Sequence, residues 1–302
     1  MAKFLQLVRP QFLIASLALF IIGVAWAILL GAQASLLRIL LGYLIILPAH
    51  LSVSFSNDYF DVEVDKRGTP TLFSGGSGIL VENPQLRKPA LWIAITLNLC
   101  SVGLGILFLI LYSVPIWFLG YIAVSNLLAW VYSAPPFRLA YRGLGELVTA
   151  FAAGFLIPGM GVLVTQGYLN WDRLFFTLPL MLYGLAFILA VEIPDVEADR
   201  RGLKKTWVAR KGWGFAFTAI GTLLMVATGF FFCISALSSH PLPVDFRLLG
   251  FLSLLPLGMG VIGMVKRPAD RHTAIQYANG TIGTLAMFFI LTDVVLVYAA
   301  SN

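Results

Sequence analysis

The sequence predicts an all-α polytopic membrane protein. Of its 302 residues, 59% are hydrophobic and only 11% are charged, whereas a soluble domain carries about 25% charged residues. Apolar stretches long enough to cross a hydrocarbon core, which takes roughly 20 helical residues, recur along the whole sequence. These observations exclude an ordinary soluble globule, and we expect a single transmembrane domain over residues 1–302.

Nine stretches qualify as transmembrane helices. Gly and Pro interrupt several of them, which buried membrane helices tolerate because neighbouring groups satisfy the freed backbone. Lys3 and Arg9 lead directly into a full-length span, unlike a removable signal peptide, so we expect the N-terminus to stay in the mature protein. The expected spans are residues 11–32, 35–56, 90–111, 113–132, 144–166, 174–193, 213–237, 247–265 and 274–300.

Basic residues are distributed unequally between the two sides of this topology. Seventeen Lys and Arg residues share one side, and only Arg38, Arg173 and Arg247 fall on the other. Cytoplasmic loops carry an excess of Lys and Arg, so we expect a cell-membrane protein with a cytoplasmic N-terminus and an outer C-terminus. The net charge of +6 then belongs to one membrane face, and we expect no nucleic-acid partner.

We expect structural roles for three polar residues inside the spans. Cys100 and Cys233 lack the spacing of a metal or redox motif, and buried Cys usually packs as a small hydrophobe. Asp293 is an intramembrane acid and thus a functional candidate by default. Its distance from the acidic motifs described next favours a structural role.

Two expected cytoplasmic segments, 57–89 and 194–212, resemble each other. The run from Asp61 to Gly68 matches the run from Asp195 to Gly202 at an offset of 134 residues. Each run follows an even-numbered span, the second and the sixth, and an offset of four spans preserves orientation. This pattern indicates two parallel pseudo-repeats that face each other across a common site.

Each repeat places three carboxylates on one helix face. The two stripes are Asp58, Asp61 and Asp65 in the first repeat, and Glu192, Asp195 and Asp199 in the second. Like charges near a low-dielectric region must be offset by cations. Oxygen ligands without His or Cys favour Mg²⁺, which binds through one or two carboxylates plus substrate phosphates, and Asn57 can add an amide oxygen. The alternative, solvated acidic helix ends, explains two repeated triads on one side less well.

Basic residues follow each acidic stripe directly. Arg and Lys bind phosphate oxygens, by a bidentate fork and a compact charge respectively, and Arg67 and Lys204 are the favoured diphosphate-binding candidates. The excess of cytoplasmic Lys and Arg alone would also place basic residues here, so only a few are expected to be functional. Arg9, at the entrance to the first span, either binds phosphate or anchors the helix.

A metal and diphosphate site that opens into an apolar bundle suits a prenyl diphosphate. Mg²⁺ and basic residues stabilise the departing diphosphate, aromatic faces stabilise an allylic cation, and an apolar cavity excludes water. His50 lies on roughly the same helix face as Asn57, but deeper. It either lines this cavity or is a hydrogen-bonded structural residue.

The segment from Tyr132 to Glu146 is a third candidate patch. Pro135 and Pro136 force an extended or turned backbone, which gathers aromatic and charged side chains on the cytoplasmic side. Tyr132, Arg138 and Tyr141 are the expected acceptor-binding residues. The alternative is an interfacial loop with aromatic belt residues.

The acidic motifs resemble those of the UbiA superfamily of intramembrane prenyltransferases. Residues 57–65 resemble its first motif, NDxxDxxxD, and residues 195–199 its second, DxxxD. The resemblance implies nine helices around a central cavity open sideways to lipid, with two Mg²⁺ ions and a diphosphate between the motifs. The metal or diphosphate residues that it implies are Asn57, Asp61, Asp65, Asp195 and Asp199, with Asp58 close by.

Two further segments look more like the menaquinone branch, whose acceptor is 1,4-dihydroxy-2-naphthoate. The run from Gly68 to Gly78 stands where the 4-hydroxybenzoate and glycerolipid branches have an Arg-Pro-rich stretch, and the run from Tyr141 to Glu146 also matches. Glu192 stands where many relatives have Asn. The alternative acceptors are 4-hydroxybenzoate and a glycerol phosphate lipid, as for digeranylgeranylglyceryl phosphate synthase.

Two other classes of protein explain the sequence less well. CDP-alcohol phosphotransferases also use Asp-rich helices, but their Asp-Gly and Ala-Arg signature precedes neither triad. A transporter suits a repeat with intramembrane acids. Here, however, the acids cluster at helix ends on one side instead of at the midplane.

Overall fold

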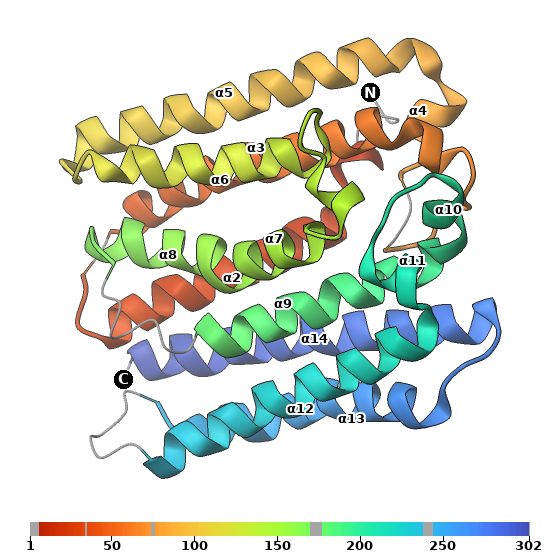
Figure 1. Cartoon of the computed structure of the whole chain (residues 1–302). Helices are drawn as coiled ribbons and strands as arrows, with labels where there is room; N and C mark the ends of the chain where they lie inside the picture. The colour runs from red at the N-terminus through yellow and green to blue at the C-terminus, as the bar shows by residue number, and fades with distance from the viewer. Residues whose placement is uncertain (1–5, 34, 74–75, 170–176, 238–243, 302) are drawn as a thin grey trace.

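Long helices dominate the structure of this chain, a computed structural model that describes residues 6–33, 35–73, 76–169, 177–237 and 244–301. Within these ranges every regular element is a helix (Figure 1). The long elements are α2 (Pro10–Leu29), α3 (Leu36–Asp65), α5 (Arg87–Tyr112), α6 (Trp117–Ser133), α9 (Thr177–Glu192), α12 (Trp213–Leu237), α13 (Phe246–Lys266) and α14 (Arg271–Ser301). The shorter ones are α4 (Ile79–Glu82), η1 (Pro84–Leu86), η2 (Leu139–Arg142), α7 (Gly145–Phe151), η3 (Ala152–Leu156), α8 (Ile157–Gln166), η5 (Ile193–Asp195), α10 (Val196–Arg201) and α11 (Trp207–Lys211).

Eight helical runs in the described residues are long and apolar enough to cross a membrane. They coincide with eight of the nine expected spans, one of them formed by α7, η3 and α8 together. The remaining expected span, 113–132, coincides with α6, which has 17 residues and is shorter than a usual crossing. Arg173 and residues 174–176 of the sixth expected span lie outside the described ranges.

The two acidic motifs lie on helices of different continuity. α3 runs unbroken for 30 residues, with Pro48 inside it, and carries the first motif in its last turns. α9 ends at Glu192, and Pro194 then lies in the 3₁₀ turn η5 before α10 begins. Because Pro lacks an N–H and disfavours a continuous helix, the second motif lies across this 3₁₀ turn. The expected stripe from Glu192 to Asp199 on one face of a continuous helix is therefore wrong.

One turn of π-helix joins α7 to α8. In η3 the hydrogen-bond register is displaced, and the Tyr121 hydroxyl of α6 donates to the carbonyls of Phe155 and Leu156 at 3.1 and 2.9 Å. A side chain thus partners backbone groups at the π turn. Such turns occur frequently at functional sites, and this one lies beside the cavity described below.

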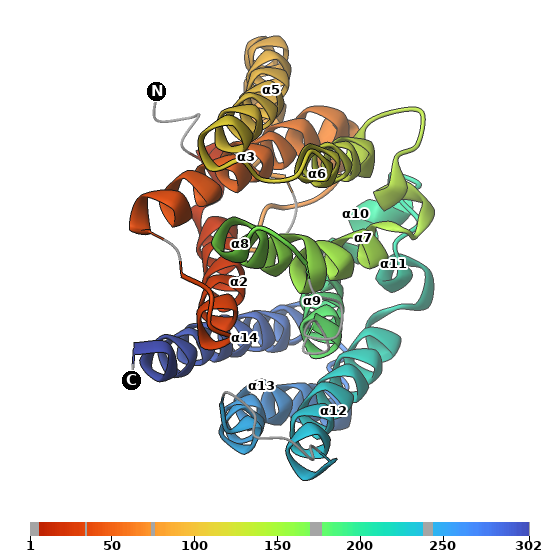
Figure 2. The ribbon, with the colours of Figure 1, turned by 90° about the vertical axis from the view of Figure 1, so that its left-hand side faces the viewer.

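Small residues allow α2 and α8 to cross at close range. A Cβ atom on Gly161 would lie 2.3 Å from the Phe20 carbonyl oxygen, and one on Gly23 would lie 1.9 Å from that of Pro158. Close backbone approach through glycine is a usual way to pack membrane helices. One core cluster lies among α2, α9, α12, α13 and α14 and another among α2, α3, α5, α6 and α8. α2 therefore belongs to both halves of the bundle (Figure 2).

Candidate active site

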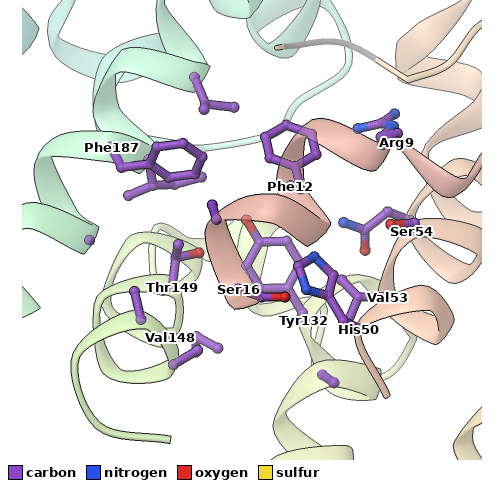
Figure 3. A pocket seen from close by; sticks show the side chains of 18 of the residues that line it. Arg9, Phe12, Ser16, His50, Val53, Ser54, Tyr132, Val148, Thr149 and Phe187 are labelled. Atoms are coloured by element: carbon purple, nitrogen blue, oxygen red, sulfur yellow. The ribbon is translucent and has the colours of Figure 1, made fainter. Parts of the chain in front are cut away.

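A cavity of about 380 Å³ lies inside the bundle, lined by α2, α3, α6, α9, α10 and the run from α7 to α8. Figure 3 shows Arg9, Phe12, His50 and Tyr132 among the side chains around it. Most of the lining is apolar. The motif residues that line it are Asn57, Asp58, Asp61, Asp65, Asp195 and Asp199.

The loop after the first motif folds back onto that motif. Asp58 forms an ion pair with Arg9 at 2.6 Å and accepts hydrogen bonds from the Ser77 backbone N–H, at 3.1 Å, and from its hydroxyl. Asp65 accepts a hydrogen bond from the Gly76 backbone N–H at 3.0 Å. The Gly-Ser run therefore supplies donors to two carboxylates of the first stripe.

Asp61 joins the two halves of the site. Its carboxylate accepts from the Lys204 ammonium at 3.0 Å and from the Tyr141 hydroxyl at 2.8 Å. Burial disfavours the ammonium form, but the carboxylates of Asp61 and Asp199 outweigh burial and raise the pKa of Lys204 well above its ordinary value. Lys204 is therefore a fixed positive charge at the cavity, where an anionic group can approach it.

The second motif is held by the segment that follows it. Asp199 accepts from the Thr206 hydroxyl at 3.2 Å, and its backbone carbonyl accepts from the Lys204 N–H at 2.9 Å. Thr206 also caps α11, because its hydroxyl oxygen accepts from the Ala209 N–H at 3.1 Å. Asp195 lines the cavity at the junction of η5 and α10.

Three hydrogen bonds connect the segment 139–146 to the segment 203–207. The Lys205 N–H donates to the Tyr141 carbonyl at 3.1 Å. The Trp207 indole N–H donates to the Gly143 carbonyl at 2.9 Å, and its backbone N–H donates to the buried Glu146 carboxylate at 2.5 Å. These bonds hold Tyr141 and Lys204 next to each other, where both side chains donate to Asp61.

The two segments that match in sequence also touch in space. The Arg67 guanidinium donates to the Arg201 carbonyl, and 134 residues separate the two, which is the offset of the sequence match. Gly68 faces Ala198 and Gly202 faces Val64, so that an added Cβ would lie 3.1 Å from the first and 2.7 Å from the second. Both acidic segments lie at the end of the bundle that carries α4, α10 and α11 (Figure 1).

The other candidate residues fall into two groups. Arg9, His50, Tyr132, Glu192 and Lys204 line the cavity together with the motif residues. Arg67, Arg138 and Tyr141 do not line it. The Arg138 guanidinium lies over the Tyr141 ring, 4.7 Å from its centre, so it reaches the site through Tyr141.

Four residues that donate hydrogen bonds to motif side chains are not predicted as site residues by the sequence. They are Gly76, Ser77, Ser133, whose hydroxyl donates to the Asn57 amide oxygen at 2.6 Å, and Thr206. Thr206 carried a signal, because Thr directly before an apolar run is a helix N-cap pattern. Gly76 and Ser77 belong to the Gly-Ser run after the first motif, and Ser133 belongs to the patch from Tyr132 to Glu146. Neither pattern predicts that these residues contact the acidic motif.

The donor set of the cavity fits Mg²⁺. In the described part of the chain, no three His, Cys, Asp or Glu side chains form a metal centre by themselves. Mg²⁺ usually binds one or two carboxylates, substrate phosphates and several waters, so it does not require such a cluster. The polar end of the cavity, where the motif residues Asn57, Asp58, Asp61, Asp65, Asp195 and Asp199 lie, offers carboxylate and amide oxygens from both motifs. Such oxygens suit a hard cation.

A bundle of apolar, membrane-length helices around a cavity with acidic and basic residues at one end defines an integral membrane protein with a cavity of the kind that binds small molecules. The chain belongs to the UbiA prenyltransferase family, whose family model matches residues 16–291. It is therefore a membrane prenyltransferase, and the all-helical fold expected from the sequence is confirmed.

Individual relatives agree with this assignment. The chain is 26% identical over 225 residues to the 1,4-dihydroxy-2-naphthoate octaprenyltransferase of Bacillus subtilis (strain 168), covering 74% of this chain and 70% of that protein. A UbiA homolog from Archaeoglobus fulgidus, solved bound to GPP and Mg²⁺, matches 98% of this chain and 99% of its own with a TM-score of 0.68 at 16% identity. A structure of digeranylgeranylglyceryl phosphate synthase matches 98% of each chain with a TM-score of 0.67 at 15% identity. At these identities the two structures establish the fold alone.

Proposed function

We propose that the protein transfers a prenyl group from a prenyl diphosphate to an aromatic quinone precursor of the 1,4-dihydroxy-2-naphthoate type, in a reaction that depends on Mg²⁺. The observation that carries the proposal is a single cavity with two acidic motifs at one end and an apolar lining elsewhere. Such a cavity suits a charged diphosphate at one end and a hydrocarbon chain along the rest.

The polar end provides groups for both the metal and the diphosphate. Asn57, Asp58, Asp61, Asp65, Asp195 and Asp199 would hold two Mg²⁺ ions, and Arg9 and Lys204, which line the cavity, would bind the diphosphate. Arg67, the third diphosphate candidate, lies outside the lining and donates to the Arg201 carbonyl. Bound Mg²⁺ would neutralise the charge that grows on the departing diphosphate. Arg9 and Lys204 form ion pairs with Asp58 and Asp61. Basic groups for the diphosphate and carboxylates for the metal ions therefore lie next to each other.

The aromatic acceptor is supported by the third patch and by one relative. Tyr132 lines the cavity, while Arg138 and Tyr141 stack directly outside it. The aromatic faces of Tyr132 and Tyr141 and the Arg138 cation, next to the polar end of the cavity, would orient a planar, anionic ring towards the prenyl carbon. The curated Bacillus subtilis relative is named for such an acceptor.

A glycerol phosphate lipid is the second candidate acceptor. The fold likeness to digeranylgeranylglyceryl phosphate synthase covers almost the whole chain, and many acceptors are compatible with one fold. We favour the naphthoate acceptor because the Gly-Ser run, which donates to Asp58 and Asp65, stands where the lipid and 4-hydroxybenzoate branches both have an Arg-Pro-rich stretch.

The membrane topology is part of the proposal. Nine crossings, with the 17-residue α6 as the fourth, would place the N-terminus and both motifs on the cytoplasmic side and the C-terminus outside. The two halves would form parallel pseudo-repeats, which the reciprocal contacts of Gly68 with Ala198 and of Gly202 with Val64 support.

Product analysis tests the proposed function. The purified protein would be incubated with Mg²⁺, radiolabelled prenyl diphosphates and three acceptors: 1,4-dihydroxy-2-naphthoate, 4-hydroxybenzoate and a glycerol phosphate lipid. We expect a carbon-prenylated naphthalene product. An ether-linked glycerolipid as the only product would assign the protein to the lipid branch and leave the metal and diphosphate site unchanged.

A further inference from the structure

Glu192 is a buried acid at the cavity whose part in the reaction has not been assigned. It is the last residue of α9, three residues before Asp195, and its side chain lines the cavity. Only 7% of the residue is exposed. Its Oε2 atom is buried and has no hydrogen-bond partner among the residues that the structure describes.

The charged neighbours of Glu192 in the described residues do not donate a hydrogen bond to its Oε2 atom. Glu146 of α7 and Asp199 of α10 are acids and repel it, while Lys204 and the Tyr132 hydroxyl complete its titratable surroundings. The Lys204 ammonium donates to Asp61, and no ion pair with Glu192 forms in the described chain. A buried carboxyl oxygen without a hydrogen-bond partner is unfavourable by itself, so a partner from a bound molecule would stabilise it.

The chemistry of the substrates identifies that donor. A diphosphate is an anion that accepts hydrogen bonds, and a prenyl chain has no polar group. Of the two organic substrates, only the acceptor carries a hydroxyl group that can donate to Glu192. A Mg²⁺-bound water is the other possible donor in the proposed reaction, and it would not distinguish the two inhibitors described below. We propose that Glu192 accepts a hydrogen bond from a ring hydroxyl of the aromatic acceptor, an inference that rests on the proposed function.

This contact would orient the acceptor and favour the reaction. Glu192 would hold the ring hydroxyl, and so the ring, at a fixed position in the cavity. A hydroxyl hydrogen-bonded to a carboxylate releases more electron density into its ring, which makes the ring carbons better nucleophiles towards an allylic cation.

Two inhibitors that differ by one hydroxyl test the contact. 4-Hydroxy-2-naphthoate and 2-naphthoate would be measured as competitive inhibitors against the acceptor, in the wild type and in Glu192→Met. Loss of a hydrogen bond that leaves a buried polar group unpaired changes affinity by roughly fivefold to a hundredfold. We therefore expect the wild type to prefer the hydroxylated inhibitor by about that factor and Glu192→Met to lose the preference. The 1-hydroxy isomer, whose hydroxyl is adjacent to its own carboxylate and can donate to it, tests the other ring position in the same way.

Two controls separate this contact from a structural role. Met fills a similar volume without a buried charge, so Glu192→Met should keep or raise the melting temperature, and the KM for prenyl diphosphate should stay within about twofold. Glu197→Gln, on the exposed face of α10, should keep the wild-type preference.

The outcomes distinguish the inference from the proposed function. Equal hydroxyl preference in wild type and Glu192→Met, for both isomers, would overturn the role of Glu192 while aromatic transfer stands. A wild type that transfers to no aromatic acceptor would overturn the proposed acceptor, and the role of Glu192 with it.

Discussion

Gly202 packs against Val64 so closely that a Cβ atom on the glycine would lie 2.7 Å from a Val64 methyl carbon. The matching pair at the offset of 134 residues, Gly68 and Ala198, has the reciprocal contact with more room, since a Cβ atom on Gly68 would lie 3.1 Å from the Ala198 Cβ atom. Each glycine follows one acidic motif and touches the other. The two contacts therefore determine how closely the motifs approach.

Gly202→Ala should lower turnover by about tenfold or more, because the added methyl must displace a buried, β-branched Val64 next to Asp65. Gly68→Ala should lower it less, since it meets only the small Ala198. Both glycines have backbone conformations that alanine can adopt, so the difference reports crowding. The measurement is kcat for prenyl transfer with the melting temperature of each variant. Equal rates in the two variants would contradict the proposed spacing.

Prenyl transfer should require a divalent cation. Carboxylates from two helices meet at the polar end of the cavity, and a diphosphate can approach them only after their charge is neutralised. Exhaustive chelation should abolish the activity, and added Mg²⁺ should restore it. Full activity in a chelated sample, with no metal found by elemental analysis, would remove the metal assignment.

Asp61→Asn and Asp195→Asn should each reduce turnover by orders of magnitude in a folded protein, because each removes a proposed ligand charge. Glu197→Gln is the matched control, since Glu197 lies on the exposed face of α10 between Asp195 and Asp199. Steady-state kinetics and size-exclusion profiles of the three variants check this. If the control were as damaging as Asp195→Asn, the assignment of one functional face to the second motif would be wrong.

Arg138→Ala and Tyr141→Phe should affect different substrates. Arg138 stacks on the Tyr141 ring, so its loss should raise the KM for the aromatic acceptor by about tenfold. The Tyr141 hydroxyl donates to Asp61, so Tyr141→Phe, which keeps the ring, should act mainly on the diphosphate step. The KM values for both substrates in both variants provide the test. A shift confined to prenyl diphosphate in Arg138→Ala would exclude Arg138 from acceptor binding.

Local periodicity explains why much of the site was predictable. Asp58, Asp61 and Asp65 share a face because α3 continues unbroken past its apolar part, as the sequence pattern predicted. For the same reason eight expected spans coincide with long apolar helices. Hydrophobic length and helical spacing are properties of neighbouring residues, so they can be read without knowledge of the rest of the chain.

The sequence by itself therefore determined the helical membrane class and the positions of the two acidic motifs. The tertiary structure decided the partners of those motifs: Tyr141 and Lys204 reach Asp61 from 80 and 143 residues away, and the buried Oε2 atom of Glu192 has no hydrogen-bond partner in the described ranges. These contacts depend on the paths of loops and on the break of α9 at Pro194. No periodic pattern encodes such paths, because long-range packing selects them.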